Sequence, residues 1–194
     1  MTKIIGLTGG IGSGKSKVAA YLQSIGIPVY IADEEARKVM AGEMIVNAVK
    51  AAFGSDIVTE GTINRQKLSQ IVFDEPQKLQ VLNNIVHPAV RQHFKEWLLN
   101  NKEAPLVFKE AAILFETGAD ADCDAVITVT APLDIRIKRV MSRDSVTKEE
   151  VEKRMASQWN DQQKIDRSDY VISNIEFEDT VAEIEKILKI LRDI

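Results

Sequence analysis

Short runs of apolar residues alternate with stretches of helical periodicity along this chain. Residues 4–8 form the first run, and a helical pattern follows from Lys15 to Ser24, where Gly26 ends it. Further short runs occupy residues 27–32, part of 105–115, 124–130 and 169–173. Buried strands that alternate with helices are typical of a parallel sheet covered on both faces. The pattern therefore predicts a three-layer α/β fold around a five-stranded parallel sheet.

A long helical stretch separates the second and third predicted strands. Residues 34–101 have helical periodicity, with breaks expected at Gly54, Gly61, Pro76 and Pro88. Such a stretch is longer than a simple crossover between strands. We therefore expect it to be a helical insertion that binds a substrate.

The last third of the chain contains a smaller helical excursion at residues 133–167. Pro132 starts a helix that extends to about Met141, and the capping-box pattern at 147–150 opens another that extends to about Trp159. A closing helix is expected over residues 178–192.

Length, charge and cysteine content restrict the class of protein. A chain of 194 residues favours a single domain over residues 1–194, and its net charge of −4 argues against a dedicated nucleic-acid binder. The apolar runs are too short for a membrane span, and the N-terminal residues lack a signal-peptide pattern. Cys123 is the one cysteine, so no internal disulfide forms, and we expect it to fill space. These features predict a cytoplasmic protein with no nucleic-acid or membrane partner and no evident obligate protein partner.

The stretch GGIGSGKS at residues 9–16 fits G-x-x-x-x-G-K-[ST] at every fixed position, between a predicted strand and a predicted helix. Glycines let the backbone approach a phosphate closely, and the N–H groups of such a loop form an anion-binding nest. Lys15 would reach the β- and γ-phosphates, and the Ser16 hydroxyl would hold Mg²⁺. The motif thus predicts a P-loop for ATP and Mg²⁺. Its expected nucleotide contacts are Gly10, Ile11, Gly12, Ser13, Gly14, Lys15, Ser16 and Lys17. A dinucleotide-binding loop would need glycine at position 15 and is excluded.

Two further candidate residues have open roles from their positions alone. Asp33 follows the second predicted strand, where ligands bind in parallel sheets, so it either accepts a proton from an attacking hydroxyl or caps the next helix. Residues 84–88 are expected to end one helix and start another, so His87 either caps a helix or contacts a ligand. Arg91 lies one turn beyond it.

Three arginines share one face of the helix expected after Pro132. Arg136, Arg139 and Arg143 fall within an arc of about 60°, opposite an apolar stripe made of Leu133, Ile137, Val140 and Met141. Such a face is either solvated or, in a phosphoryl-transfer enzyme, contacts the transferring phosphoryl group. The pattern leaves both interpretations open.

An ordered set of motifs resembles the dephospho-CoA kinase family over nearly the whole chain. The motifs are GLTGGIGSGKS at 6–16, Asp33 with Arg37, HPAVR at 87–91, ILFETG at 113–118, RMASQ at 154–158 and SDYVISN at 168–174. The resemblance implies a P-loop core, a helical substrate domain at 34–101 and a lid at 133–167. It also implies transfer of the γ-phosphate of MgATP to the ribose 3′-hydroxyl of dephospho-CoA, the last step of coenzyme A synthesis.

The resemblance also assigns roles to particular residues. Asp33 would be the base, while Lys15 and Arg143 would steady the migrating phosphoryl group. The remaining matches are Arg37, His87 and Arg91 on the dephospho-CoA side, and Arg139 and Asn174 on the ATP side, with Asn174 near the adenine.

The chain departs from the family pattern at one position. The family usually carries Asp-x-Pro-Leu-Leu-Phe-Glu on the third strand, whereas this chain has Glu110 at the acidic position and no proline. Glu110 is either near the metal or a buried, paired structural carboxylate.

Two other functions are weaker matches. Another small kinase, for a nucleoside monophosphate or a metabolite alcohol, would share the P-loop but should lack the combination of HP-x-x-R with LFE. A GTPase-type switch would need an Asn-Lys-x-Asp motif, which the sequence does not contain.

Overall fold

The computed structural model describes residues 2–73 and 75–193, which divide into two compact units. The first unit combines the residues up to Ile31 with those from Asn101 onward, and the second is Ala32–Asn100. Each unit has its own hydrophobic core and is described by itself.

A five-stranded sheet with strand order β2-β5-β1-β6-β7 forms the centre of the first unit, and all its strand pairs are parallel. The strands are β1 (Lys3–Thr8), β2 (Val29–Ile31), β5 (Leu106–Glu110), β6 (Ala125–Thr130) and β7 (Tyr170–Ser173). The predicted α/β class is therefore confirmed. β2 is shorter than the expected range 27–32, because Pro28 has no N–H to donate to a ladder, although its carbonyl accepts from Phe108 N–H at 2.9 Å.

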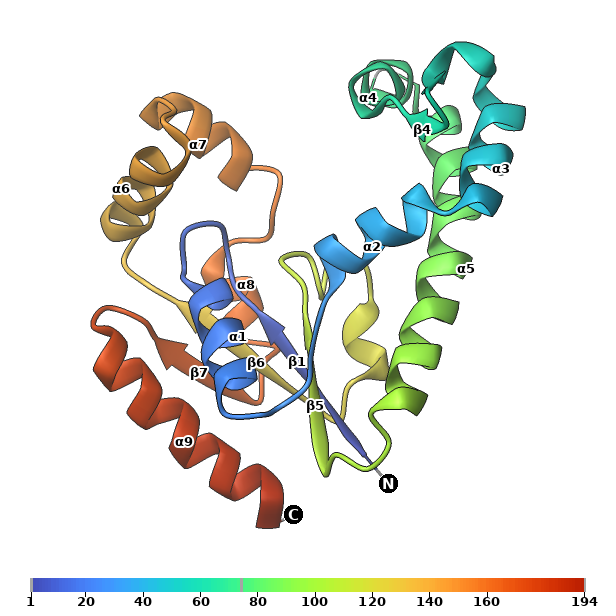
Figure 1. Ribbon diagram of the computed structural model, residues 1–194. Coiled ribbons are helices and arrows are strands. Elements are labelled where there is room, and N and C mark those ends of the chain that lie inside the picture. Colours follow the sequence, from blue (N-terminus) through green and yellow to red (C-terminus); the bar gives the residue numbers. More distant parts are fainter. Residues whose placement is uncertain (1, 74, 194) are drawn as a thin grey trace. The chain divides into compact units, whose positions relative to one another are not determined.

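Helices cover both faces of this sheet (Figure 1). The helices that contact its strands are α1 (Lys15–Ser24), α8 (Asp161–Ile165) and α9 (Phe177–Asp193), and a 3₁₀ turn η2 (Ala119–Asp122) follows β5. Helices α6 (Leu133–Asp144) and α7 (Lys148–Met155) pack against each other in a separate small cluster. Alternate strand residues such as Leu7 and Ile127 pack with α1 and α9 in the main core. Val126 faces the other way and packs with Leu114, Phe115 and the partly buried Trp159.

The capping box predicted at the start of α7 is present. The Thr147 hydroxyl accepts from Glu150 N–H, and the Glu150 carboxylate accepts from Thr147 N–H. The helix ends at Met155 and not near Trp159, because Asn160 starts a second capping box with Gln163 that opens α8. Asn160 and Gln163 have the same spacing as Thr147 and Glu150, so the expected single helix to about Trp159 misses this second start.

In its described residues, 32–73 and 75–100, the second unit contains four α-helices and a small hairpin around a separate core. Its elements are α2 (Ala32–Ala41), α3 (Glu43–Phe53), a 3₁₀ turn η1 (Ser55–Ile57), β3 (Val58–Thr59), β4 (Thr62–Ile63), α4 (Arg65–Phe73) and α5 (Pro76–Asn100). Ile45, Val49, Ile57 and Leu68 form the buried centre. The hairpin was not predicted, since strands of two residues show no periodicity.

The helix boundary expected at residues 84–88 is wrong. α5 runs without interruption from Pro76 to Asn100, with Pro88 inside it. Proline removes one helical hydrogen bond, at a cost of about 3 kcal/mol in a helix interior. Packing of α5 against α2, α3 and α4 offsets this cost. His87 is therefore a mid-helix residue and not a cap.

A buried ion pair joins α8 to the segment after β5. Lys164 is 0% exposed, and its ammonium donates to the Glu116 carboxylate at 2.6 Å and to the Ala112 carbonyl at 3.0 Å. The same carboxylate oxygen accepts from Trp159 N–H at 2.9 Å. Burial alone would raise the pKa of Glu116, but the hydrogen bonds from Lys164 and Trp159 outweigh it and hold the pKa below its usual value.

This pair predicts a specific acid sensitivity. Because the folded-state pKa of Glu116 is lowered, its contribution to stability is present above the usual glutamate pKa and is lost as pH falls through the folded value. Glu116→Gln should cost about 3 kcal/mol at pH 7, since it leaves Lys164 buried without its counter-charge. The variant should then lose less further stability than the wild type between pH 7 and a pH below the folded-state pKa of Glu116. Urea unfolding at both pH values measures this.

Glu103→Gln, at an exposed glutamate of the same unit, is the matched control and should follow the wild type. Equal losses of stability on acidification in Glu116→Gln and the wild type would contradict the assignment.

Candidate functional site

The glycine-rich loop lies at the carboxyl edge of the sheet, between the end of β1 and the start of α1. Gly12 and Gly14 have φ values of 81° and 92°, which favour glycine. Gly14 occupies the N-cap position of α1, no side chain caps this helix, and no acidic residue occupies its first turn. The positive end of α1 thus remains available to an anion.

Lys15 is held beside the loop by a buried carboxylate. Its ammonium lies 2.7 Å from Glu110 Oε1, and Glu110 is only 4% exposed at the end of β5. Leu7 of β1 pairs with Glu110 in the sheet, which places the ion pair directly below the loop. Glu110 is therefore a paired carboxylate in this structure. Anionic phosphate oxygens would compete with it for Lys15.

Asn174 and Arg139, both predicted on the ATP side, contact the loop and the segment beside it. Asn174 is 2% exposed, and its amide donates to the Ser13 carbonyl at 2.7 Å. Its Oδ1 accepts from the Thr180 hydroxyl at 3.1 Å. The Arg139 guanidinium donates to the Asn174 and Ile175 carbonyls at 2.9 and 3.1 Å. Both the NH₂ group and the oxygen of the Asn174 amide thus have partners within the protein. The contact with adenine that was expected for Asn174 stays a prediction.

Two residues that the sequence did not assign to the loop hold Ile11. Arg136 Nε donates to the Ile11 carbonyl at 2.9 Å, and Gln158 Oε1 accepts from Ile11 N–H at 3.0 Å. Arg136 also pairs with Asp161. For Arg136 the solvated interpretation of the basic helix face is wrong, because it is 7% exposed. Gln158 belongs to the RMASQ motif at 154–158, but nothing in the sequence indicated that it contacts Ile11.

The apolar stripe of α6 is narrower than predicted. Ile137 and Val140 are buried with Val151 of α7 in a small cluster of their own. Leu133 and Met141 are exposed. This half of the predicted stripe is therefore wrong.

Arg143 lies in the last turn of α6 and is 62% exposed at its side chain. It donates to the Asp144 carboxylate at 2.7 and 3.0 Å, and Arg154 donates to the same group at 2.9 Å. The hydrogen bond from Arg143 lowers the pKa of Asp144, so this carboxylate stays ionised and holds both guanidinium groups. Phosphate oxygens would have to replace Asp144 as their partner.

Ser16 and Lys17 are exposed in the first turn of α1. The Lys17 ammonium lies 5.1 Å from the centre of the Phe177 ring. Among the described residues, no group of three or more histidine, cysteine, aspartate and glutamate side chains is placed to hold a metal ion. A hydroxyl such as that of Ser16 and a carboxylate such as that of Glu110 are nevertheless oxygen donors of the kind that Mg²⁺ accepts alongside phosphates.

The remaining candidates belong to the second unit. Asp33 is exposed in the first turn of α2, and Arg37 is exposed one turn later. The alternative that Asp33 caps the helix is wrong, because α2 begins at Ala32. His87 and Arg91 are exposed and lie one turn apart on α5, which packs against α2.

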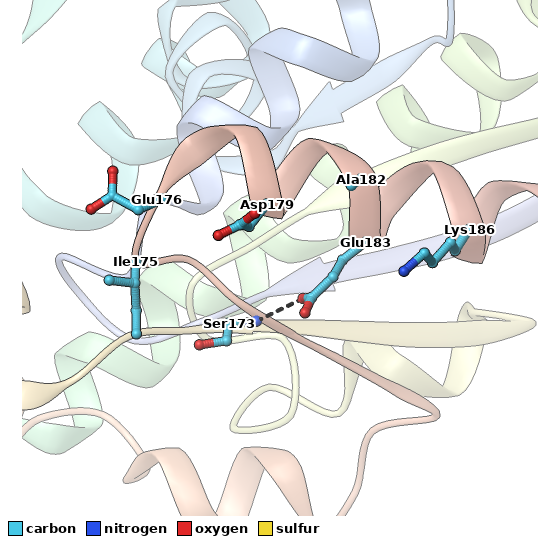
Figure 2. A pocket seen from close by; sticks show the side chains of 7 residues that line it. All are labelled: Ser173, Ile175, Glu176, Asp179, Ala182, Glu183 and Lys186. Atoms are coloured by element: carbon cyan, nitrogen blue, oxygen red, sulfur yellow. Dashed lines mark hydrogen bonds between the residues drawn. The ribbon is translucent and has the colours of Figure 1, made fainter.

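A pocket of about 360 Å³ is lined by residues of β7, of α9 and of the segment between them (Figure 2). Its lining consists of Ser173, Ile175, Glu176, Asp179, Ala182, Glu183 and Lys186. The three carboxylates disfavour an anion, and Glu183 already accepts from Ser173 N–H at 3.1 Å. Within residues 2–73 and 75–193, no helix has the length and apolar character of a membrane span.

Comparisons with known proteins agree on one family. The model of the family described as dephospho-CoA kinase matches residues 3–179. A dephospho-CoA kinase of Geobacillus kaustophilus is 44% identical over 179 residues, which cover 90% of this chain and 89% of the relative.

Solved structures resemble the chain over most of its length. A crystal structure of a Thermus thermophilus protein has a TM-score of 0.89 and 37% identity, with 96% of each chain covered. A dephospho-CoA kinase from Campylobacter jejuni has a TM-score of 0.73 and 26% identity, with 100% of this chain and 98% of that chain covered.

The geometry of the loop predicts that Gly14 has no room for a side chain. A Cβ at Gly14 would collide with the Asn174 amide, whereas one at Gly118, which also has positive φ, would meet open space. Each alanine variant should lose about 1 kcal/mol of stability from backbone strain. Only Gly14→Ala should also lower ATP affinity, by about tenfold or more. Calorimetric titration of both variants with MgATP tests this; equal affinities would contradict the close packing of Asn174 on the loop.

Proposed function

The chain belongs to the dephospho-CoA kinase family and is an ATP-dependent kinase of the last step of coenzyme A synthesis. We propose which of its residues take part in transferring the γ-phosphate of ATP to the ribose 3′-hydroxyl of dephospho-CoA, and what each of them does. The observation that carries the proposal is the loop at 9–16, with an uncapped helix N-terminus and Lys15 beside it, in a chain that matches the family over residues 3–179.

The loop binds the phosphates of ATP. Its backbone N–H groups and the positive end of α1 supply donors, and Lys15 exchanges Glu110 for the β- and γ-phosphate oxygens. Because Glu110 is buried and remains close by, it limits the net positive charge of the site when no nucleotide is bound.

The Ser16 hydroxyl would hold Mg²⁺, and Glu110 would offer a second oxygen donor if Lys15 pairs with the phosphates instead. When bound, the ion neutralises charge that develops on the phosphate oxygens. The donor set fits, because Mg²⁺ is commonly held by one or two protein oxygens together with substrate phosphates.

The second unit supplies the acceptor side of the reaction. Asp33 takes the proton of the ribose 3′-hydroxyl while the ribose oxygen forms a bond to the γ-phosphorus. The bond between the γ-phosphorus and the oxygen that bridges it to the β-phosphate breaks, and ADP is released. Arg37, His87 and Arg91 are exposed on α2 and α5 and bind dephospho-CoA.

The segment at 133–167 acts as the lid. On closure Arg143 leaves Asp144 for the phosphates, and water is excluded from the transferring group. An arginine placed there contributes about 10³–10⁵ to the rate in related chemistry.

The proposal includes a cytoplasmic location, with a small-molecule substrate and no nucleic-acid, membrane or obligate protein partner. Burial raises the pKa of Cys123 to about 11, so its thiol stays protonated and unreactive at neutral pH, as expected of a packing residue.

Asp33→Asn tests the assignment of the base. The substitution keeps the size of the side chain but removes its basicity, so kcat should fall about 10²–10⁴-fold. ATP affinity should remain near the wild-type value. Glu34→Gln, at the neighbouring exposed acid, is the matched control and should keep its turnover. Near wild-type turnover in Asp33→Asn would remove Asp33 from the role of base.

The acceptor is tested by product analysis. The full chain is incubated with MgATP and a panel containing dephospho-CoA, nucleoside monophosphates and small alcohols, and products are identified by mass. Coenzyme A should appear from dephospho-CoA, with no phosphorylation of the other acceptors. A nucleoside diphosphate as the main product would favour a different small-molecule kinase.

A further inference from the structure

Two peptide groups of the phosphate loop could reverse their orientation with little backbone strain, because a glycine follows each of them. Reversing a peptide changes ψ of the residue before it and φ of the residue after it. The peptides 11–12 and 13–14 precede Gly12 and Gly14, whose φ values of 81° and 92° lie in the region where glycine adopts either sign easily. Type I and type II turns differ by such a reversal of their central peptide.

Reversal would reduce phosphate binding. A loop of this kind binds anions because its N–H groups point at them. If either peptide turned over, its carbonyl oxygen would replace its N–H on the phosphate side and repel the anion. The glycines that let the backbone approach a phosphate therefore also permit the conformation that opposes binding.

In this structure a buried side chain holds the carbonyl of each of these two peptides. Arg136 Nε donates to Ile11 O at 2.9 Å, and Asn174 Nδ2 donates to Ser13 O at 2.7 Å. The two side chains are 7% and 2% exposed. They come from different elements, α6 and the segment after β7, and contact the loop at different carbonyls.

Both side chains are themselves fixed. Arg136 pairs with the Asp161 carboxylate, whose other oxygen accepts from the Thr130 hydroxyl at 2.7 Å. Asn174 Oδ1 accepts from the Thr180 hydroxyl at 3.1 Å, which orients its NH₂ toward Ser13. Gln158 adds a contact on the other side of Ile11, at its N–H.

We propose that Arg136 and Asn174 are positioning residues that lock the two reversible peptides of the loop, so that Gly12 N–H and Gly14 N–H stay on the phosphate side. The inference rests on the proposed binding of ATP phosphates to this loop. In this proposal Asn174 affects binding of the phosphates, whereas an adenine contact would affect binding of the base.

The test compares tripolyphosphate and adenosine as probes of the full chain. Asn174→Asp keeps the size of the side chain and an acceptor for Thr180, but places an oxygen against Ser13 O. Arg136→Lys keeps the charge beside Asp161 but loses the fork that reaches Ile11 O as well. Each variant should weaken tripolyphosphate binding about tenfold, the loss expected for one hydrogen bond, with adenosine binding unchanged.

Ile184→Val is the matched control for stability. It removes a methyl group from a fully packed position of α9 in the main core and makes no change at the loop. It should lower the melting temperature and leave tripolyphosphate affinity unaltered.

Tripolyphosphate affinities within twofold of the wild type in both loop variants would overturn the proposal. Loss of adenosine binding alone in Asn174→Asp would overturn it in favour of an adenine contact. A wild-type chain that binds neither ATP nor tripolyphosphate would overturn the proposed function, and this inference with it.

A measurement on the wild type covers the case in which a variant fails to fold. Three-bond NMR couplings report φ of Gly12 and Gly14 in the nucleotide-free protein. Values for a single, positive φ at both residues support the lock. Averaging between positive and negative φ would overturn it.

Discussion

The orientation of a few backbone peptides is the constraint on which the rest of this structure depends. A loop that offers its N–H groups to a polyanion must turn carbonyls the other way, into the protein, where each needs a donor. The chain supplies donors from distant segments: Arg136 for Ile11 and Asn174 for Ser13. Parallel strands bring these segments together, since β1, β6 and β7 are neighbours and all end at the same edge. The sheet topology is thus a requirement of the loop as much as of the core.

Lys15, Arg143 and Arg136 of the first unit differ in what holds them. Lys15 and Arg143 are each paired with a carboxylate, Glu110 and Asp144, which phosphate oxygens would replace in the proposed reaction. Arg136 is buried against Asp161 and the loop itself, so an incoming anion does not free it. Lys15 and Arg143 therefore fit the proposed role of contacting the phosphates during transfer, and Arg136 fits the proposed role of holding the loop backbone in place. Burial and neighbouring side chains cause this difference, since all three residues carry the same positive charge.

The sequence predicts features that local rules govern, and it is weaker where long-range contacts decide. The start and end of α1, the capping box at Thr147 and the five parallel strands follow from periodicity and from particular cap and glycine residues. The helix break predicted at Pro88 is wrong, because packing of α5 against its neighbours outweighs the tendency of proline to end a helix. Burial of Arg136 could not be predicted either, as its partners Ile11 and Asp161 are remote in sequence. The roles of Asp33, Arg37, His87 and Arg91 remain predictions from motif resemblance.

The anchors of the loop also limit which part of the proposed lid is able to move. Arg136, Gln158 and Asp161 all belong to the segment 133–167, yet each is tied to the loop directly or through one neighbour. A closure that displaced them would release Ile11 and disturb the phosphate site at the moment of use. In the proposed closure, the moving part therefore has to lie between the anchors, in the distal end of α6 and in α7, where Arg143 and Arg154 share Asp144. The proposed lid would thus close over a loop that its own base holds in place.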